Sequence, residues 1–399
     1  MPPFTLLQIV PSLDTGGAEL SAIEISEAVT RAGGRSIIAT QGGRLEATAR
    51  EQGAKIHKLP AASKNPVCIL ANSLELIRVA KKEKVSLIHA RSRAPAWSAL
   101  WAARYANLPF VTTYHGAYNE NGPIKRFYNS VMARGDLVIA NSVFTGKLIQ
   151  QRYGTPDKKL RVIYRGVDSS FALHHVTAKR IDELRSSWGI APGRRIILQA
   201  ARLTAWKGQR ILVEAAKILH QSGGLDNVLF VLAGDDQGRE AYRTDLQSLV
   251  DRHGLGSHVK LVGHVSDIAA AFAGAHISII ASIEPEAFGR TAVEAQALGC
   301  PVIATRLGAP QETVLAEPDV SSDSFTGWLV KAGDAGELAA AIDEALDLSR
   351  DQRRDLGERA IQNVQTRFTL EQMKRQTLEV YDELLGSKLA EAFDYAPQC

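Results

Sequence analysis

Short apolar runs alternate with segments of helical periodicity along most of this chain. In the first half, several such runs have the length and composition of buried strands. These predicted strands are Leu6–Val10, Ser36–Ala39, Leu87–His89, Phe110–Thr113 and Leu137–Ala140. Predicted helices lie between them, near residues 18–32, 69–83, 95–106 and 142–152, and residues 162–168 supply a last strand and turn. Such alternation predicts a parallel sheet with helices on both faces.

The same pattern starts again in the second half of the chain. The predicted strands are Arg195–Ala200, Val228–Ala233, His258–Val262, Ile277–Ala281 and Val302–Ala304, and helical patterns follow near 335–347, 351–366 and 368–385. A more polar stretch that contains Pro192 separates the two series. We therefore predict an α/β protein with a first domain over residues 1–168, a linker over 169–192 and a second domain over 193–367.

The composition is that of an ordinary soluble protein. At 399 residues, with 45% apolar and 23% charged residues, the chain can bury two separate cores. A net charge of +4 is too small to argue for nucleic-acid binding. Cys68, Cys300 and Cys399 lie far apart, without metal-ligand or redox spacing, which favours a reduced cytoplasmic protein. The start lacks a signal peptide's charged region, and no apolar stretch approaches the ~20 residues that cross a bilayer.

Two carboxylates separated by seven residues, Glu286 and Glu294, stand between a predicted strand and a predicted helix. Glu286 therefore falls at a strand's carboxyl edge, where open α/β sheets bind ligands, and Glu294 falls a turn or more into the helix. Two acids in this position can bind sugar hydroxyls, while backbone N–H groups at the helix start hold an anion. On spacing alone, a solvated carboxylate pair on an ordinary loop and helix remains an alternative.

Two pairs of residues and a histidine follow other predicted strands. Gly16 and Gly17 come after the first strand, where glycine lets a backbone turn approach a ligand closely. Arg202 and Lys207 come after Ala200, where two cations suit a diphosphate, although a solvated basic loop has the same composition. His115 follows Phe110–Thr113, and a lone histidine in such a place is more often packed or solvated than functional.

The segment Glu286-Ala-Phe-Gly-Arg-Thr-Ala-Val-Glu294 resembles the E-x7-E signature of retaining glycosyltransferases of family GT4, group 1. Ala201–Gly208 resembles the family's G-R-L-x-x-x-K-G motif, and Gly16–Glu19 resembles its Gly-Gly-x-Glu turn. The resemblance covers nearly the whole chain. It implies the GT-B fold, in which two Rossmann-like domains face each other across a cleft. The N-terminal domain would take the acceptor, and the C-terminal domain would bind the nucleotide sugar.

The resemblance also assigns the end of the chain and the candidate site residues. Residues 368–386 would form a crossover helix that packs on the N-terminal domain, and 387–399 a tail. Arg202 and Lys207 would hold the pyrophosphate, Glu286 would lie near the transferred sugar, and Glu294 would bind the ribose diol. The remaining donor-side or active-site residues implied by the family are Gly16, Gly17, His115, Val265, Phe288, Gly289 and Arg290.

A departing diphosphate carries negative charge that must be stabilised in the transition state. Many transferases use a metal held by an Asp-x-Asp motif, which this sequence lacks. We therefore predict metal-independent catalysis with no cofactor, the substrate being a GDP- or UDP-linked sugar. Three residues depart from the family pattern: Ala201 replaces a glycine, Arg165 a common asparagine, and Arg290 a common aliphatic residue. These departures leave the class intact and weaken any choice of donor by analogy.

Our hypothesis is a retaining hexosyltransferase, with a mannosyl or glucosyl donor preferred, acting on a glycan or lipid-linked acceptor in bacterial envelope polysaccharide or lipopolysaccharide biosynthesis. A nucleotide-sugar epimerase of the same fold and a non-catalytic nucleotide- or glycan-binding protein are the alternatives. Basic and aromatic residues at Lys125–Tyr128 suit peripheral docking at the inner membrane, and equally suit an ordinary surface helix. Arg91 and Arg93, after another strand, would contact an anionic acceptor or be solvated.

Overall fold

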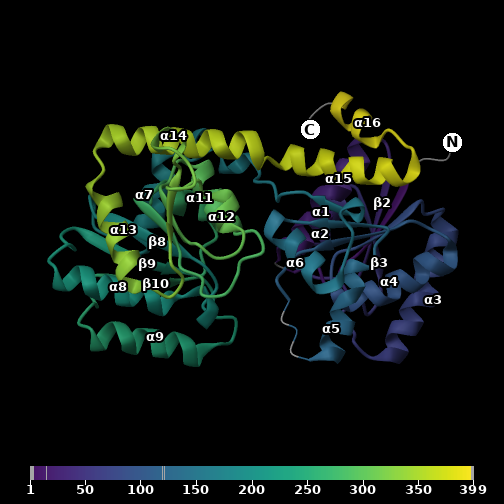
Figure 1. Cartoon of the computed structure of the whole chain (residues 1–399), viewed down its shortest axis with the longest axis horizontal. Coiled ribbons are helices and arrows are strands. Elements are labelled where there is room, and N and C mark those ends of the chain that lie inside the picture. Colours follow the sequence, from purple (N-terminus) through teal and green to yellow (C-terminus); the bar gives the residue numbers. More distant parts are fainter. Residues whose placement is uncertain (1–3, 15, 119, 121, 397–399) are drawn as a thin grey trace. The chain divides into compact units, whose positions relative to one another are not determined.

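The computed structural model describes residues 4–14, 16–118, 120 and 122–396, which divide into two compact units (Figure 1). The first unit comprises the described residues of 1–164 and 371–399, and the second comprises residues 165–370. Each unit is a parallel sheet covered by helices, as the alternating pattern predicts. Within the described residues, no helix is both long enough and apolar enough to span a membrane.

The first unit is built on a seven-stranded parallel sheet in the order β3-β2-β1-β4-β5-β6-β7. Its strands are β1 (Thr5–Ile9), β2 (Arg35–Thr40), β3 (Ala54–Lys58), β4 (Leu87–Ala90), β5 (Phe110–Tyr114), β6 (Leu137–Ala140) and β7 (Leu160–Val162). Every residue of β1, β4, β5 and β6 is buried, as expected for strands with helices on both faces. The strand order reverses between β1 and β4, the position at which such sheets bind ligands.

Helices pack on both sides of this first sheet. They are α1 (Gly17–Arg31), α2 (Glu46–Glu51), α3 (Pro66–Glu83), α4 (Arg93–Ala106), α5 (Pro123–Asn129) and α6 (Val143–Tyr153). One apolar cluster joins Leu7 and Ile9 of β1 to Trp97 of α4, and another joins Ile38 of β2 to Ile23 of α1. The two clusters fix the sheet between its helical layers.

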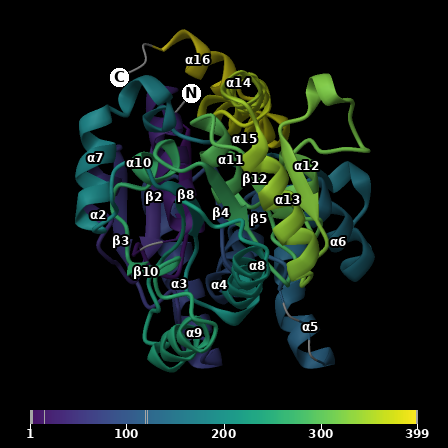
Figure 2. The same cartoon turned by 90° about the vertical axis from the view of Figure 1, so that its left-hand side faces the viewer.

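The second unit repeats the plan with six parallel strands in the order β10-β9-β8-β11-β12-β13. Its strands are β8 (Arg195–Ala200), β9 (Val228–Ala233), β10 (Val259–Gly263), β11 (Ile277–Ile280), β12 (Val302–Thr305) and β13 (Gly327–Val330). Its helices are α7 (Ala178–Ser187), α8 (Gln209–Gln221), α9 (Glu240–Arg252), α10 (Ile268–Ala273), α11 (Arg290–Ala297), α12 (Pro310–Thr313), α13 (Ala335–Asp347) and α14 (Arg350–Arg367). Figure 2 shows α8 and α13 together against this sheet. The order reverses between β8 and β11.

Residues 169–192, expected as a linker, lie within the second unit instead. They contain α7, which contacts α10 and contributes Val176 and Leu184 to the apolar cluster around Phe272. Arg180 of this segment also forms an ion pair with Asp267, with 2.7 Å between Nη2 and Oδ1. The segment belongs to the unit because it has apolar side chains to bury there.

The C-terminal helix returns to the first unit, as the family resemblance implies. Helix α15 (Leu370–Leu385) is followed by α16 (Leu389–Tyr395), and α15 lies beside α1 in Figure 1. Tyr381 of α15 is fully buried, and its hydroxyl lies 2.7 Å from Nδ1 of His89 on β4. This polar contact within the core ties the end of the chain to the central strands of the first sheet.

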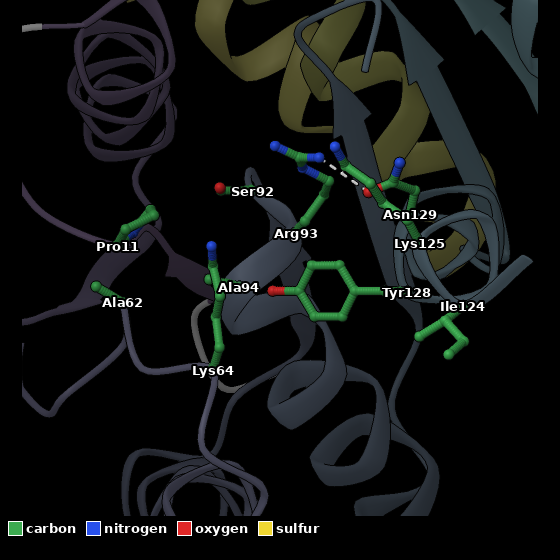
Figure 3. Close-up of a pocket in the computed structure, with 10 residues that line it drawn as sticks. All are labelled: Pro11, Ala62, Lys64, Ser92, Arg93, Ala94, Ile124, Lys125, Tyr128 and Asn129. Carbon is green, nitrogen blue, oxygen red and sulfur yellow. Dashed lines mark hydrogen bonds between the residues drawn. The ribbon is translucent and has the colours of Figure 1, made fainter. Parts of the chain in front are cut away.

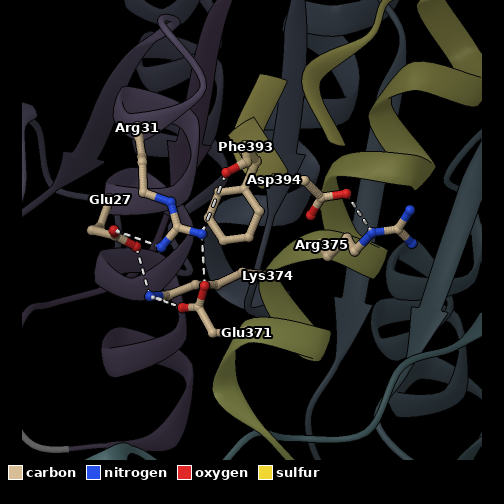
Figure 4. Close-up of polar contacts among 7 residues, drawn as sticks. All are labelled: Glu27, Arg31, Glu371, Lys374, Arg375, Phe393 and Asp394. Atoms are coloured by element: carbon tan, nitrogen blue, oxygen red, sulfur yellow. Dashed lines mark hydrogen bonds and ion pairs between the residues drawn. The ribbon is translucent and has the colours of Figure 1, made fainter. Parts of the chain in front are cut away.

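Charged groups also connect α15 with α1 (Figure 4). Arg31 of α1 donates to Glu371 at 2.6 Å, and Lys374 lies 2.7 Å from Glu27 and 3.1 Å from Glu371. The Arg31 guanidinium also stacks over the ring of Phe393 of α16, 3.4 Å from its centroid. The side chains of Arg31 and Lys374 are only 9% and 10% exposed, so these pairs are largely removed from water.

Candidate functional site

The loop after β8 is held tightly against the end of β11 in the second unit. The chain leaves β8, forms the 3₁₀ turn η5 (Ala205–Lys207) and enters α8 through Gly208. Gly208 has φ +71°, and a Cβ atom there would lie 1.8 Å from the carbonyl oxygen of Ala281. The amide of Ile283 also donates to the carbonyl of Trp206 at 2.8 Å. Glycine is therefore required, because the two loops touch through their backbones at the reversal of strand order.

Lys207 and Glu286 meet at this point. The Nζ atom of Lys207 donates to Oε1 of Glu286, and the Ser282 hydroxyl donates to the same oxygen at 2.6 Å. The side chains of Lys207 and Glu286 are only 15% and 10% exposed. The backbone carbonyl of Glu286 accepts a hydrogen bond from Ala309 at 3.0 Å. The ammonium and the carboxylate are thus fixed at the edge of the sheet. The sequence predicted that each would follow a strand, and the structure shows that they form a pair.

Arg202 lies on the same loop as Lys207 but projects elsewhere. Its side chain is exposed, and Nη1 lies 3.5 Å from Oε1 of Gln237, beyond β9. Its backbone carbonyl accepts a hydrogen bond from Gln209 at 2.9 Å, which fixes the loop rather than the guanidinium. Arg202 therefore retains an exposed cation near this sheet edge, whereas Lys207 is paired.

Helix α11 positions the second carboxylate of the spaced pair. It begins after Gly289, which has φ +77°, and it carries Arg290 and Glu294 one turn apart. Nε and Nη2 of Arg290 each lie 3.1 Å from Oε1 of Glu294. Burial raises the pKa of Glu294, while Arg290 and the buried Arg165 act in the opposite direction. The two arginines that depart from the family pattern therefore both influence this carboxylate.

Phe288 and Val265 are held mainly by packing. Phe288 is 4% exposed and meets Phe368 edge to face, with 5.9 Å between ring centroids, so its side chain belongs to the core. Val265 is half-buried in the loop between β10 and α10 and packs against an apolar cluster. In the same loop, Asp267 caps α10 by accepting from the amide of Ala270 at 3.0 Å. Arg180 lowers the pKa of Asp267 by hydrogen bonding, so this acid serves local structure.

The remaining predicted residues belong to the first unit. Gly16 is the N-cap of α1 and Gly17 its first residue, and a Cβ atom on Gly16 would lie 2.1 Å from Oε2 of Glu19. The Glu19 carboxylate therefore folds back over this turn. His115 follows the end of β5 and is half-buried.

Arg91 is neither a solvated side chain nor an anion-binding one. It is 2% exposed, and its guanidinium donates to Oε1 of Gln8 at 2.5 Å and to the Ser21 hydroxyl at 3.2 Å. The neighbouring His89 places Nε2 2.7 Å from the Thr113 hydroxyl, and burial lowers its pKa well below the usual value. These polar groups form part of the core beneath the sheet edge. Their strand position predicted a surface role because the partners lie far away in sequence.

No group of three or more His, Cys, Asp or Glu side chains with a geometry suited to a metal ion occurs among the residues that the structure describes. The charged groups near the reversal of strand order in the second sheet are the Lys207–Glu286 ion pair and the exposed side chain of Arg202. With Glu294 on the adjoining helix, this set of groups suits an anion that carries hydroxyl groups nearby.

Two family models match the chain. The model described as glycosyl transferases group 1 matches residues 180–363, and that described as glycosyltransferase family 4 matches residues 15–171. The chain is 26% identical over 329 residues to the N-acetyl-α-D-glucosaminyl L-malate synthase of Bacillus anthracis, a match that covers 79% of each protein.

Solved structures match over nearly the full length. A glycosyltransferase from Rickettsia africae is 34% identical, with a TM-score of 0.87, and the match covers 97% of this chain and 100% of that one. Anabaena HepE, solved in complex with UDP-glucose, is 25% identical, with a TM-score of 0.79 and coverage of 95% and 99%.

Proposed function

We propose that this chain, which belongs to the GT4-type glycosyltransferases of the GT-B fold, transfers a hexosyl unit from a nucleotide-diphosphate sugar to a glycan or lipid-linked acceptor. The observation that carries the proposal is the Lys207–Glu286 pair at the reversal of strand order in the second sheet. Charge that develops on a leaving diphosphate is best stabilised by a fixed cation in a largely dry site. Lys207 is such a cation, and Glu286 and Ser282 fix its position.

The proposed reaction proceeds with retention and without a metal ion. The bond between the sugar's anomeric carbon and the diphosphate oxygen breaks, and the acceptor oxygen bonds to that carbon from the same face. The acceptor's proton passes to the departing phosphate oxygen. Lys207, with Arg202, offsets the charge on the diphosphate, Glu286 orients Lys207 and accepts hydrogen bonds from the sugar, and Glu294 accepts them from the ribose.

A UDP-linked hexose is the donor to test first, because HepE, which shares the fold along the whole chain, was solved with UDP-glucose. The proposed setting is bacterial envelope polysaccharide or lipopolysaccharide biosynthesis. Exposed apolar side chains on three adjoining helices support an acceptor at a membrane surface. We call this set the α3–α5 face: Val67, Leu70 and Leu74 of α3, Trp101 and Tyr105 of α4, and Ile124 and Phe127 of α5.

Basic residues accompany the α3–α5 face. Lys81 lies 5.5 Å from the ring centroid of Tyr105, and Lys125 and Arg126 adjoin Ile124 and Phe127 on α5, so cations accompany the apolar side chains at both α4 and α5. This combination suits peripheral docking at a bilayer of anionic lipids. Co-sedimentation with phosphatidylglycerol vesicles tests it, and Trp101→Ser/Phe127→Ser should reduce the bound fraction. Equal binding by the wild type and this variant would remove the membrane from the proposal.

The activity is tested by a donor screen in the presence of EDTA. UDP-glucose, UDP-galactose, UDP-N-acetylglucosamine and GDP-mannose are each incubated with the protein and a membrane-lipid extract from a lipopolysaccharide-producing bacterium. Released nucleoside diphosphate and labelled lipid should both appear with one donor and disappear in Lys207→Ala. Conversion of the sugar without release would indicate the epimerase, and nucleotide binding without turnover would indicate a binding protein.

A further inference from the structure

The first unit contains a pocket of about 850 Å³ beside the carboxyl ends of its central strands (Figure 3). Four segments form its walls: the loop after β1 contributes Pro11, the loop after β3 contributes Ala62 and Lys64, and the start of α4 and the length of α5 contribute the rest. The residues that complete the lining are Ser92, Arg93, Ala94, Ile124, Lys125, Tyr128 and Asn129. A pocket of this size, at the reversal between β1 and β4, is large enough for a small ligand or a headgroup.

The charge of the pocket has one sign. Lys64, Arg93 and Lys125 line it, and none of the ten lining residues carries a carboxylate. Lys64 and Lys125 are exposed, so their ammonium groups are available to a ligand. Arg93 is fixed more firmly, because it donates to Oδ1 of Asn129 at 2.9 Å and stacks 4.0 Å from the ring centroid of Tyr118. Three cations around one hollow favour an anionic ligand.

Neutral hydrogen-bond donors lie in the same hollow. The Tyr128 hydroxyl is buried and has no hydrogen-bond partner within the described residues, and Figure 3 shows its ring extending into the pocket. Burial raises the pKa of Tyr128, so the hydroxyl keeps its proton and can donate. Ser92, the N-cap of α4, makes no capping hydrogen bond through its side chain in the described structure. The N-terminus of α4, which favours negative charge, therefore begins at the pocket wall with a hydroxyl that is not used as a cap.

We propose that this pocket binds a phosphate or diphosphate group of the acceptor, so that the acceptor is a phosphorylated molecule rather than a neutral glycan. The proposal rests on the glycosyltransferase function above and names its substrate class. A phosphate offers several acceptor oxygens to ammonium and hydroxyl donors at once, whereas a neutral sugar would leave the cations unpaired. Ile124, 84% exposed at the pocket, also belongs to the α3–α5 face, so a lipid attached to the phosphate would meet an apolar surface.

The binding step is tested with inorganic pyrophosphate by isothermal titration calorimetry on the full chain. An Arg202→Ala/Lys207→Ala background removes both cations that we assign to the diphosphate in the second unit, so residual binding reports on the first. Lys64→Gln/Lys125→Gln in this background should weaken that binding by about tenfold or more. Lys158→Gln, an exposed lysine on another part of the first unit, is the matched control and should change nothing. Residual binding that is absent, or insensitive to the double substitution, overturns the proposal even if no enzymatic activity has been found.

The acceptor class is tested by kinetics with the donor that the screen identifies. Lipid extract and its water-soluble fraction are compared as acceptors, each before and after chemical removal of phosphate. Transfer should require the phosphate, and Lys64→Gln/Lys125→Gln should raise the apparent acceptor KM about tenfold more than the donor KM. Tyr128→Phe should raise the acceptor KM by a smaller factor. Transfer to dephosphorylated acceptor at the original rate, or equal changes in both KM values, would overturn the proposal while leaving the transferase function standing.

Discussion

Lys207 and Ser282 donate hydrogen bonds to one and the same oxygen of Glu286. A carboxylate that is only 10% exposed and accepts two donors is fixed in position, and it fixes the ammonium in turn. The pair therefore has two separable effects: it maintains the local structure where β8 and β11 end, and it holds positive charge at the position from which we propose that the diphosphate leaves.

Substitution of Lys207 should affect both the stability of the fold and the rate of the reaction, and the two effects can be measured separately. Lys207→Ala leaves the Glu286 carboxylate with Ser282 alone, which should cost about 3–5 kcal/mol of unfolding free energy. It should also lower kcat by roughly 10²–10³-fold, because a fixed cation is lost from the transition state. Urea denaturation and the donor assay measure the two quantities.

The neutral pair Lys207→Met/Glu286→Gln serves as the control. It removes both charges together, so most of the lost stability should return, whereas activity should not. Recovery of activity along with stability would show that Lys207 acts only through the fold.

Gly208→Ala should lower the stability of the second unit by more than the cost of left-handed backbone at an alanine. Left-handed backbone costs an L-residue about 1–2 kcal/mol, and the added Cβ would also collide with the Ala281 carbonyl. Gly193→Ala is the comparison, because Gly193 has φ +80° and no atom within 4 Å of the added Cβ. Thermal unfolding of both variants should show the larger loss for Gly208→Ala, and equal losses would contradict the close approach of the two loops.

Lys374→Ala should loosen the C-terminal helices from the first unit. The substitution leaves Glu27 and Glu371 facing each other with Arg31 as their remaining partner, at an expected cost of about 1.5–3 kcal/mol. Hydrogen exchange should speed up in α15 and α16 before it does so elsewhere. Lys388→Ala removes an 81% exposed lysine from the same region and should leave exchange unchanged. Identical exchange in both variants would mean that the charges contribute little to docking.

The stability of the fold should fall as the pH drops below about 6.5. Burial, aided by Arg353, lowers the pKa of His276 from its ordinary 6.5 to about 4, so the unfolded chain binds a proton in this window and the folded chain does not. The contribution of His276 is therefore present above pH 6.5 and declines between pH 6.5 and 4. His276→Gln should flatten the dependence of unfolding free energy on pH in that interval. A wild-type curve and a variant curve of the same slope would refute this assignment.

The central strands and long helices could be predicted from sequence because their apolar runs are continuous or strictly periodic. Two edge strands, β3 and β13, were not predicted, because their sequences do not form such a continuous apolar run. Residues 54–58 of β3 contain two lysines and a histidine, as suits a strand with one unpaired edge. Strand β13 begins at Gly327, and glycine is depleted in strands. The segment 169–192 reads as polar, yet a few apolar side chains are enough to dock α7.

The site could be predicted only as a set of positions. Motif spacing identified Lys207 and Glu286, but their pairing depends on loop backbones that Gly208 and Gly308 bring together. Arg91 was misread because Gln8 and Ser21, which satisfy its guanidinium, come from other elements of the fold. The basic pocket escaped notice because its cations are scattered over three segments of the sequence.

The chain passes from the first unit to the second after residue 164 and returns after residue 370. The second unit is therefore continuous in sequence, whereas the first is built from two segments, the second of which begins after residue 370. Without that second segment, His89 lacks Tyr381, and the α1 surface that carries Glu27 and Arg31 lacks its cover. A chain without these helices would contain a complete second unit and an incomplete first unit. Loss of α15 and α16 would therefore expose part of the core in the N-terminal half, far in sequence from the missing residues.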